Sequence, residues 1–137
     1  MNIKECEIKE LLTRYQLYTV YGLSPDPSRA SHYVTVYMRD KGWKMMGTHP
    51  EPHSTNHFQV FETLGEVPAE YRKFVNVFRG SNVMPRIVDE IIELGGVEVL
   101  WFQLGIFNPI AEARAESAGI KVVSDRCLII EHQKYFV

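Results

Sequence analysis

The segment from Gly22 to Ser31 reads Gly-Leu-Ser-Pro-Asp-Pro-Ser-Arg-Ala-Ser and combines residue types that suit a phosphate group. Gly22 allows the backbone to turn sharply, and Ser24, Ser28 and Ser31 offer hydroxyl donors. The Arg29 guanidinium can bind two phosphate oxygens at once, and a helix that starts here would add free N–H groups. The alternative is an ordinary turn between a strand and a helix, capped by Ser31. Composition alone favours neither.

Two familiar nucleotide signatures are missing from the chain. The dinucleotide fingerprint GxGxxG is absent, and the segment Gly47-Thr48-His49 has no acid before Glu51. In NAD sites an acid at the end of the second strand holds the ribose. There is also no GxxxxGK[ST] phosphate loop. These absences argue against a redox nicotinamide cofactor.

Cys127 is the only candidate nucleophile. It follows Asp125 and Arg126, and a neighbouring cation is typical of a reactive thiol. The apolar residues 128–130 favour a packed cysteine instead. No Ser–His–Asp set or carboxylate pair accompanies it. We therefore expect no enzyme activity, with a thiol-dependent enzyme as an alternative.

Three histidines, His49, His53 and His57, recur every four residues. On a helix they would share one face and could bind a metal ion. Pro50 and Pro52 prevent a continuous helix there, so exposed or interface histidines are the preferred interpretation.

Hydrophobic periodicity predicts alternating strands and helices. Strands are expected at 17–21, 43–46, 74–78, 97–102 and 121–124, and helices at 3–15, 31–41, 82–94 and 108–118. A turn or helix is expected at 127–132, and a short helix or irregular stretch at 58–64. This order predicts an α/β fold with a five-stranded parallel sheet. Parallel sheets bind ligands beyond the carboxyl ends of their strands, which directs attention to 22–29, 48–56, 78–82 and 103–108.

The 137 residues fit one domain spanning 1–137, and 45% of them are hydrophobic. The net charge is -2 and the basic residues are scattered, which argues against a nucleic-acid partner. No apolar run reaches the ~18 residues of a membrane span, and the charged N-terminus is unlike a signal peptide. We expect a cytoplasmic protein that does not bind membranes.

Several motifs, in this order and spacing, resemble one family. They are GLSPDPSRASHYV, a loop ending in Pro50, NVFRGS, WFQLGI and DRC followed by IIEH. The sequence is similar to the small bacterial and archaeal coenzyme A (CoA)-binding proteins, which are similar to the nucleotide-binding domain of succinyl-CoA synthetase. The resemblance runs from Glu10 to His132. It implies a Rossmann-like fold, with helices on both faces of the sheet and CoA across its carboxyl edge.

The resemblance also implies roles for individual residues. Those that would serve the phosphates are Gly22, Ser24, Arg29 and Ser31. His49 and Pro50 stand where the family usually has Asn-Pro beside the nucleotide. Phe78 and Arg79 would flank the adenosine or the pantetheine, and Gln103 and Gly105 would line the far side.

Apolar or aromatic residues replace polar ones that are usual in the family at several positions near the expected ligand mouth. Together with His53, these positions form a candidate protein-binding surface: Tyr33, Val36, Val83, Met84, Phe107 and Ile110. Such residue types are enriched at the cores of interfaces; the alternative is that they fill local packing gaps. The pattern indicates a protein partner or heterodimer, and resembles a CoA-binding scaffold re-surfaced as a designed or selected binder.

Overall fold

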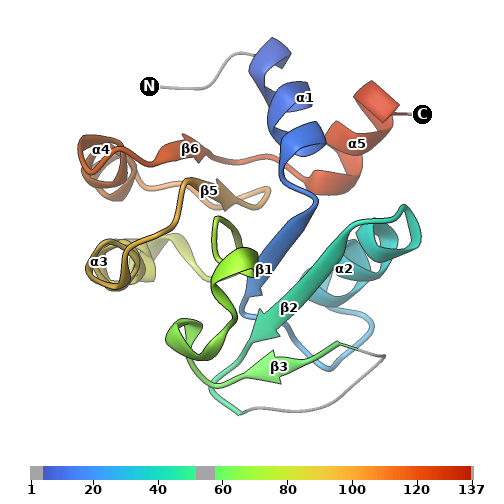
Figure 1. Ribbon diagram of the computed structural model, residues 1–137, viewed down its shortest axis with the longest axis horizontal. Helices are drawn as coiled ribbons and strands as arrows, with labels where there is room; N and C mark the ends of the chain where they lie inside the picture. Colours follow the sequence, from blue (N-terminus) through green and yellow to red (C-terminus); the bar gives the residue numbers. More distant parts are fainter. Residues whose placement is uncertain (1–4, 52–57, 137) are drawn as a thin grey trace.

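A parallel sheet of six strands, in the order β3-β2-β1-β4-β5-β6, forms the centre of the molecule (Figure 1). The computed structural model describes residues 5–51 and 58–136. The strands are β1 (Leu17–Tyr21), β2 (Lys44–Thr48), β3 (Val60–Phe61), β4 (Phe74–Val77), β5 (Val99–Phe102) and β6 (Lys121–Val123). All strand pairs are parallel. The Rossmann-like α/β prediction is therefore confirmed.

The sixth strand is a difference from the predicted five. Val60 and Phe61 pair with Gly47 and Thr48 of β2 and extend the sheet by one short edge strand. A strand of two residues is too short for the alternation of polar and apolar residues that identifies strands in a sequence. The expected helix or irregular stretch at 58–64 is replaced by this strand, and a short 3-10 turn, η1 (Leu64–Glu66), follows it.

Helices cover both faces of the sheet (Figure 1). Helices α1 (Glu5–Arg14), α2 (Ala30–Asp40) and α5 (Leu128–Phe136) lie on one face, where α5 contacts the other two. Helices α3 (Met84–Leu94) and α4 (Pro109–Ser117) pack together on the opposite face. Two further 3-10 turns, η2 (Ala69–Tyr71) and η3 (Ser81–Val83), flank β4. No described helix is long and apolar enough to cross a membrane.

Local sequence signals explain the start of α4, and a buried side chain fixes the start of α3. The Asn108 side chain caps α4 by accepting a hydrogen bond from the Ala111 N–H at 3.0 Å, and Pro109 occupies the first helical position, as predicted. Helix α3 is anchored by Met84, whose side chain is fully buried, while Leu94 is 37% exposed. The inward face of α3 therefore runs from Met84 to Ile91 and does not reach the end of the helix.

The order in which successive strands are added to the sheet changes direction at β1. It runs outward from β1 through β2 to β3, then returns to β4 and runs outward again to β6. Loops from both halves of the sheet meet above β1 and β4, at the carboxyl edge. This is the topological switch point where open parallel sheets bind ligands.

Candidate functional site

The turn after β1 is fixed by the backbone of β2. The N–H groups of Gly22 and Leu23 both donate to the Thr48 carbonyl, at 3.0 and 2.9 Å. Gly22 has a φ of 92°, in the left-handed region that favours glycine. Leu23 is fully buried against Gly47, where an added Cβ would lie 2.6 Å from the leucine Cδ2. The predicted sharp turn is thus locked to the neighbouring strand.

The serine hydroxyls shape the loop from within. The Ser31 hydroxyl oxygen accepts from the Ser24 N–H at 2.9 Å, and the Ser24 hydroxyl oxygen accepts from the Asp26 N–H. Both hydroxyls keep a proton that can be donated to a ligand. Ser28 instead donates its proton to the Asp26 carboxylate at 2.8 Å, and its N–H and hydroxyl hold the pKa of Asp26 below its usual value. Ser28 is therefore not a phosphate donor in this conformation.

Helix α2 begins with two backbone donors that have no acceptor in the described part of the chain, the N–H groups of Ala30 and Ser31. Such groups, at the positive end of the helix dipole, form an anion site. Arg29, rather than Ser31, is the N-cap residue, and its side chain makes no capping bond. Ser31 is therefore not the cap residue, and the choice between a phosphate site and an ordinary turn stays a prediction. The exposed Arg29 side chain lies at the same helix end.

A cavity of about 640 Å³ opens beside this turn, on the face of the sheet covered by α3. We call it the arginine cavity. Its lining residues are Tyr21, Thr48, Pro50, Glu62, Thr63, Leu64, Arg79, Val83, Arg86, Ile87 and Glu90. The volume lies within the range of about 300–1,000 Å³ that is usual for small-molecule sites.

Two predicted site residues, Pro50 and Arg79, line the arginine cavity. Arg79 also borders the turn, because a Cβ added at Gly22 would lie 3.0 Å from its Nε. His49 is half-buried, and its Nδ1 lies 3.1 Å from the Glu51 N–H, which donates to it. Phe78 packs partly buried against the core under α2 and α5. His53 and His57 lie outside the described residues, so the histidine spacing stays a prediction.

Two buried amide side chains have polar atoms without partners near the switch point. Asn76 in β4 is fully buried, and neither its Oδ1 nor its Nδ2 has a hydrogen bond. Gln103, just beyond β5, is 4% exposed with its Oε1 unpartnered. Asn76 pairs in register with Trp101, so Asn76 and Gln103 lie on the same face of the sheet. Buried polar atoms are normally satisfied, so these amides suit a ligand that brings its own hydrogen-bonding groups.

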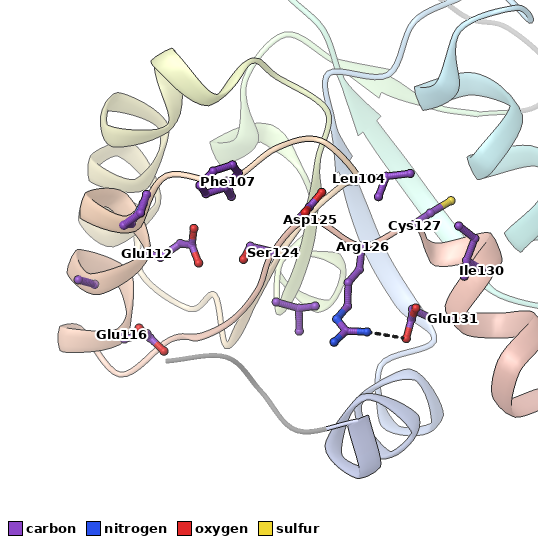
Figure 2. Close-up of a pocket in the computed structure, with 13 residues that line it drawn as sticks. Leu104, Phe107, Glu112, Glu116, Ser124, Asp125, Arg126, Cys127, Ile130 and Glu131 are labelled. Carbon is purple, nitrogen blue, oxygen red and sulfur yellow. Dashed lines mark hydrogen bonds and ion pairs between the residues drawn. The ribbon is translucent and has the colours of Figure 1, made fainter.

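A second cavity, of about 690 Å³, lies at the β6 edge of the sheet (Figure 2). We call it the β6 cavity. Arg126 crosses it to pair with the buried Glu131 carboxylate at 3.4 Å, and Cys127 lies between Leu104 and Ile130 (Figure 2). Gly105 borders this region, but its N–H already donates to the Asp125 carboxylate at 2.7 Å. The backbone of Gly105 is therefore not a free ligand donor.

The expected protein-binding residues do not form one surface. Met84, the first residue of α3, is fully buried, so its assignment to a protein-binding surface is wrong. Val36 is partly buried and packs against the core, and its assignment stays a prediction. Val83 is partly buried and lines the arginine cavity. Phe107 and Ile110 are 55% and 68% exposed at the start of α4, whereas Tyr33, 50% exposed, lies on α2 across the sheet. His53 lies outside the described residues.

Sequence reasoning missed Arg86 and Tyr21. Arg86 lies in the first turn of α3 and Tyr21 is the last residue of β1. They are far apart along the chain, so the sequence does not indicate that they line the same cavity. Only the strand order, which places β1 beside β4, brings them together.

Comparison with known proteins decides the family. The family model described as "CoA binding domain" matches residues 16–133. The chain belongs to this CoA-binding family. It is 32% identical to the protein YneT of Bacillus subtilis (strain 168), over 96% of both chains.

Solved structures share the fold of this chain. A hypothetical protein from Pyrococcus horikoshii OT3 is 26% identical and superposes with a TM-score of 0.90, covering 98% of this chain and 94% of that one. Prb, described as a protein redesigned for binding, is 27% identical with a TM-score of 0.89, covering 98% and 93%. The turn locked to β2, the free N–H groups of α2 and the unpartnered amides fit the CoA ligand of the family.

Proposed function

We propose that this chain binds CoA reversibly at the carboxyl edge of its sheet and catalyses no reaction on it. The observation that carries the proposal is the start of α2, where two N–H groups without acceptors stand behind the Gly22 turn. They offer the CoA diphosphate a positive helix end, and Arg29 adds a bidentate contact. The Ser24 and Ser31 hydroxyl protons supply further donors.

Two cavities at the carboxyl ends of the strands suit the two ends of CoA. The arginine cavity, at the ends of β1 and β2, suits the adenosine. The pantetheine arm then runs past Gln103 toward the β6 cavity. This arm contains two amide groups, which are suitable partners for the unpartnered Asn76 and Gln103 amides. The chain thus offers hydrogen bonds along the length of the ligand.

Native mass spectrometry of the purified protein tests this proposal directly. A non-covalent adduct with the mass of CoA is expected, or should appear after addition of CoA. The Arg29→Ala variant should lose most of the adduct, because the diphosphate loses its guanidinium partner. Arg14→Ala is the matched control, since Arg14 ends α1 at the opposite edge of the sheet. Absence of an adduct at saturating CoA would refute the proposal, and unchanged binding by Arg29→Ala would refute the role of Arg29.

The absence of catalysis is part of the proposal, and Cys127 provides its test. The thiol is half-buried and packs against the core under α2 and α5. Limited access slows attack by any thiol. A slow reaction of Cys127 with a thiol reagent at neutral pH is therefore expected in the folded protein. Rapid labelling, compared with the urea-unfolded chain, would favour the thiol-dependent enzyme instead.

A protein-binding surface is a second candidate function, compatible with the first. It is favoured by exposed apolar side chains around the β6 cavity: Leu104 (57%), Phe107 (55%), Ile110 (68%) and Ile130 (49%). Exposed apolar patches of this kind mark interaction sites. Sedimentation of the chain across a hundredfold concentration range would reveal self-association through this patch. If the wild-type chain stays monomeric at every concentration, and the Phe107→Ser variant sediments in the same way, a homodimer through this patch is excluded.

A further inference from the structure

Two arginines reach the arginine cavity from different elements. Arg79 follows β4, while Arg86 lies in the first turn of α3. Within the described chain neither guanidinium makes an ion pair or a hydrogen bond. Both lie close enough to the Tyr21 hydroxyl to lower its pKa, although burial raises that pKa more strongly. The cavity therefore holds two cations that no described residue neutralises directly.

The carboxylates of the same cavity are directed elsewhere. Glu90 lies four residues after Arg86 on α3, a spacing that favours an ion pair. Instead the Glu90 carboxylate accepts a hydrogen bond from the Tyr21 hydroxyl at 2.6 Å. Glu62 is exposed at the rim, just after β3. The contact between Tyr21 and Glu90 thus leaves the Arg86 guanidinium available to an external anion.

The position of Arg79 and Arg86 relative to the turn after β1 indicates which phosphate of CoA they would bind. The diphosphate is assigned to the turn after β1, and the adenosine to the ends of β1 and β2. Tyr21, Thr48 and Pro50 from these ends line the arginine cavity, and Arg79 borders Gly22. The ribose joins the diphosphate to the adenine, so in this placement it lies between the turn and the arginine cavity, where Arg79 borders both. CoA differs from other ADP-containing cofactors by a phosphate on the ribose 3′ oxygen.

We propose that Arg79 and Arg86 together bind the ribose 3′-phosphate, so that the arginine cavity selects CoA over 3′-dephospho-CoA. This inference rests on the proposed CoA binding. Guanidinium groups form paired, charge-assisted hydrogen bonds with phosphate oxygens. A phosphate held by two of them bridges the β4 turn and α3. Arg86 is then the residue that determines the choice between the two ligands.

Isothermal titration calorimetry with CoA and with 3′-dephospho-CoA tests the selection. The wild-type chain, freed of bound ligand, should bind CoA at least about tenfold more tightly than dephospho-CoA. The preference should shrink at high salt, because the contacts are ionic. If CoA itself does not bind, the proposed function fails and the inference fails with it. If CoA and dephospho-CoA bind equally well, the inference fails and the proposed function stands.

Substitutions of Arg79 and Arg86 test whether these two residues select CoA over dephospho-CoA. Arg86→Gln should weaken CoA binding about tenfold, leave dephospho-CoA binding nearly unchanged, and so remove the preference. Arg79→Gln should do the same, and an equal loss for both ligands would instead assign Arg79 to the diphosphate. Arg14→Gln, which removes the same charge at the opposite sheet edge, should keep the preference. Circular dichroism melting of each variant checks the fold, and full discrimination by a folded Arg86→Gln chain would overturn the assignment.

Discussion

Gly22 is constrained by its backbone conformation and by the nearby Arg79 side chain, whereas Gly42 has only the first of these constraints. Both Gly22 and Gly42 have φ near 100°, at 92° and 101°. A Cβ at Gly42 would meet nothing within 4 Å, whereas one at Gly22 would meet Arg79 Nε at 3.0 Å. Gly42→Ala should therefore cost about 1 kcal/mol in urea unfolding, from backbone strain alone. Gly22→Ala should cost more and also weaken CoA binding, because Arg79 must move. Equal losses of stability and unchanged affinity would show that Arg79 is not constrained by the turn.

We expect Asn76 to stabilise the complex with CoA and to destabilise the ligand-free protein. Its amide is fully buried, with both polar atoms unpartnered, and each unsatisfied group costs about 1–3 kcal/mol. Asn76→Leu keeps the branched shape, so the free energy of unfolding of the ligand-free chain should rise by about 1–3 kcal/mol. Affinity for CoA should fall.

Asn108 is the contrasting control for this change. Its amide is satisfied by the Ala111 N–H and the Ser81 carbonyl, so Asn108→Leu should destabilise the chain by about 1 kcal/mol. A loss of stability in Asn76→Leu would show that the Asn76 amide has partners in the free protein.

The turn after β1 was easier to predict from the sequence than the cavities were. Its position could be predicted because a strand, Gly22 and a helix start stand next to one another, while the roles of Gly22 and Arg29 toward a ligand stay predictions. The place of Arg86 in the arginine cavity could not be predicted, because it depends on the placement of β1 beside β4. The error at Met84 had a usable signal: Met84, Ile87, Val88 and Ile91 follow helical spacing, and all four are buried. Extending that pattern by one turn would have placed Met84 inside.

At the level of elements, long and strongly periodic segments were predictable and short ones were not. The expected strand at 17–21 has the bounds of β1, and the continuous apolar run before Gln103 forms the fully buried β5. Strand β3 was missed because two residues carry no periodicity. A sequence signal did mark its end: Thr63 and Glu66 form a capping box around η1.

The packing of α5 against α2 predicts a dependence of stability on pH. His132 of α5 is 3% exposed among the rings of Tyr37, Trp43 and Phe136. Burial, and then the nearby Lys41, lower its pKa below the usual value near 6.5. The unfolded chain therefore binds a proton at His132 more readily than the folded chain does. Stability should rise with pH up to about 6.5 and fall as the pH drops below it.

Urea unfolding between pH 5 and 8 measures this slope. His132→Gln removes the titrating ring, so its stability should fall less steeply between pH 6.5 and 5 than that of the wild type. The two slopes are compared rather than the absolute stabilities, because the substitution also disturbs the aromatic cluster. Identical slopes would assign the acid sensitivity to other groups.

At the scale of the whole molecule, the sheet brings loops from both halves of the chain to one edge. The turn after β1 is tied to β2 through Thr48. The loop after β5 is tied to the one after β6 through Asp125, whose side chain accepts from Gly105 and whose N–H donates to Ile106. These bonds hold the turn after β1 and the loops after β5 and β6 in place. If CoA binds here as proposed, little binding energy is spent on ordering these three segments.

A ligand that spans both halves of the sheet should stabilise the entire fold. CoA at about 100 times its dissociation constant should add about 2.7 kcal/mol to the free energy of unfolding. For a chain of this size, this corresponds to a rise in Tm of roughly 8–12 °C. 3′-Phospho-ADP and pantetheine, added together as separate molecules at the same concentration, should give a much smaller rise, because the covalent link no longer supplies a high effective concentration. If 3′-phospho-ADP alone reproduced the full shift, the pantetheine arm would make no contact with Gln103 or the β6 cavity. The ligand would then occupy only the turn and the arginine cavity.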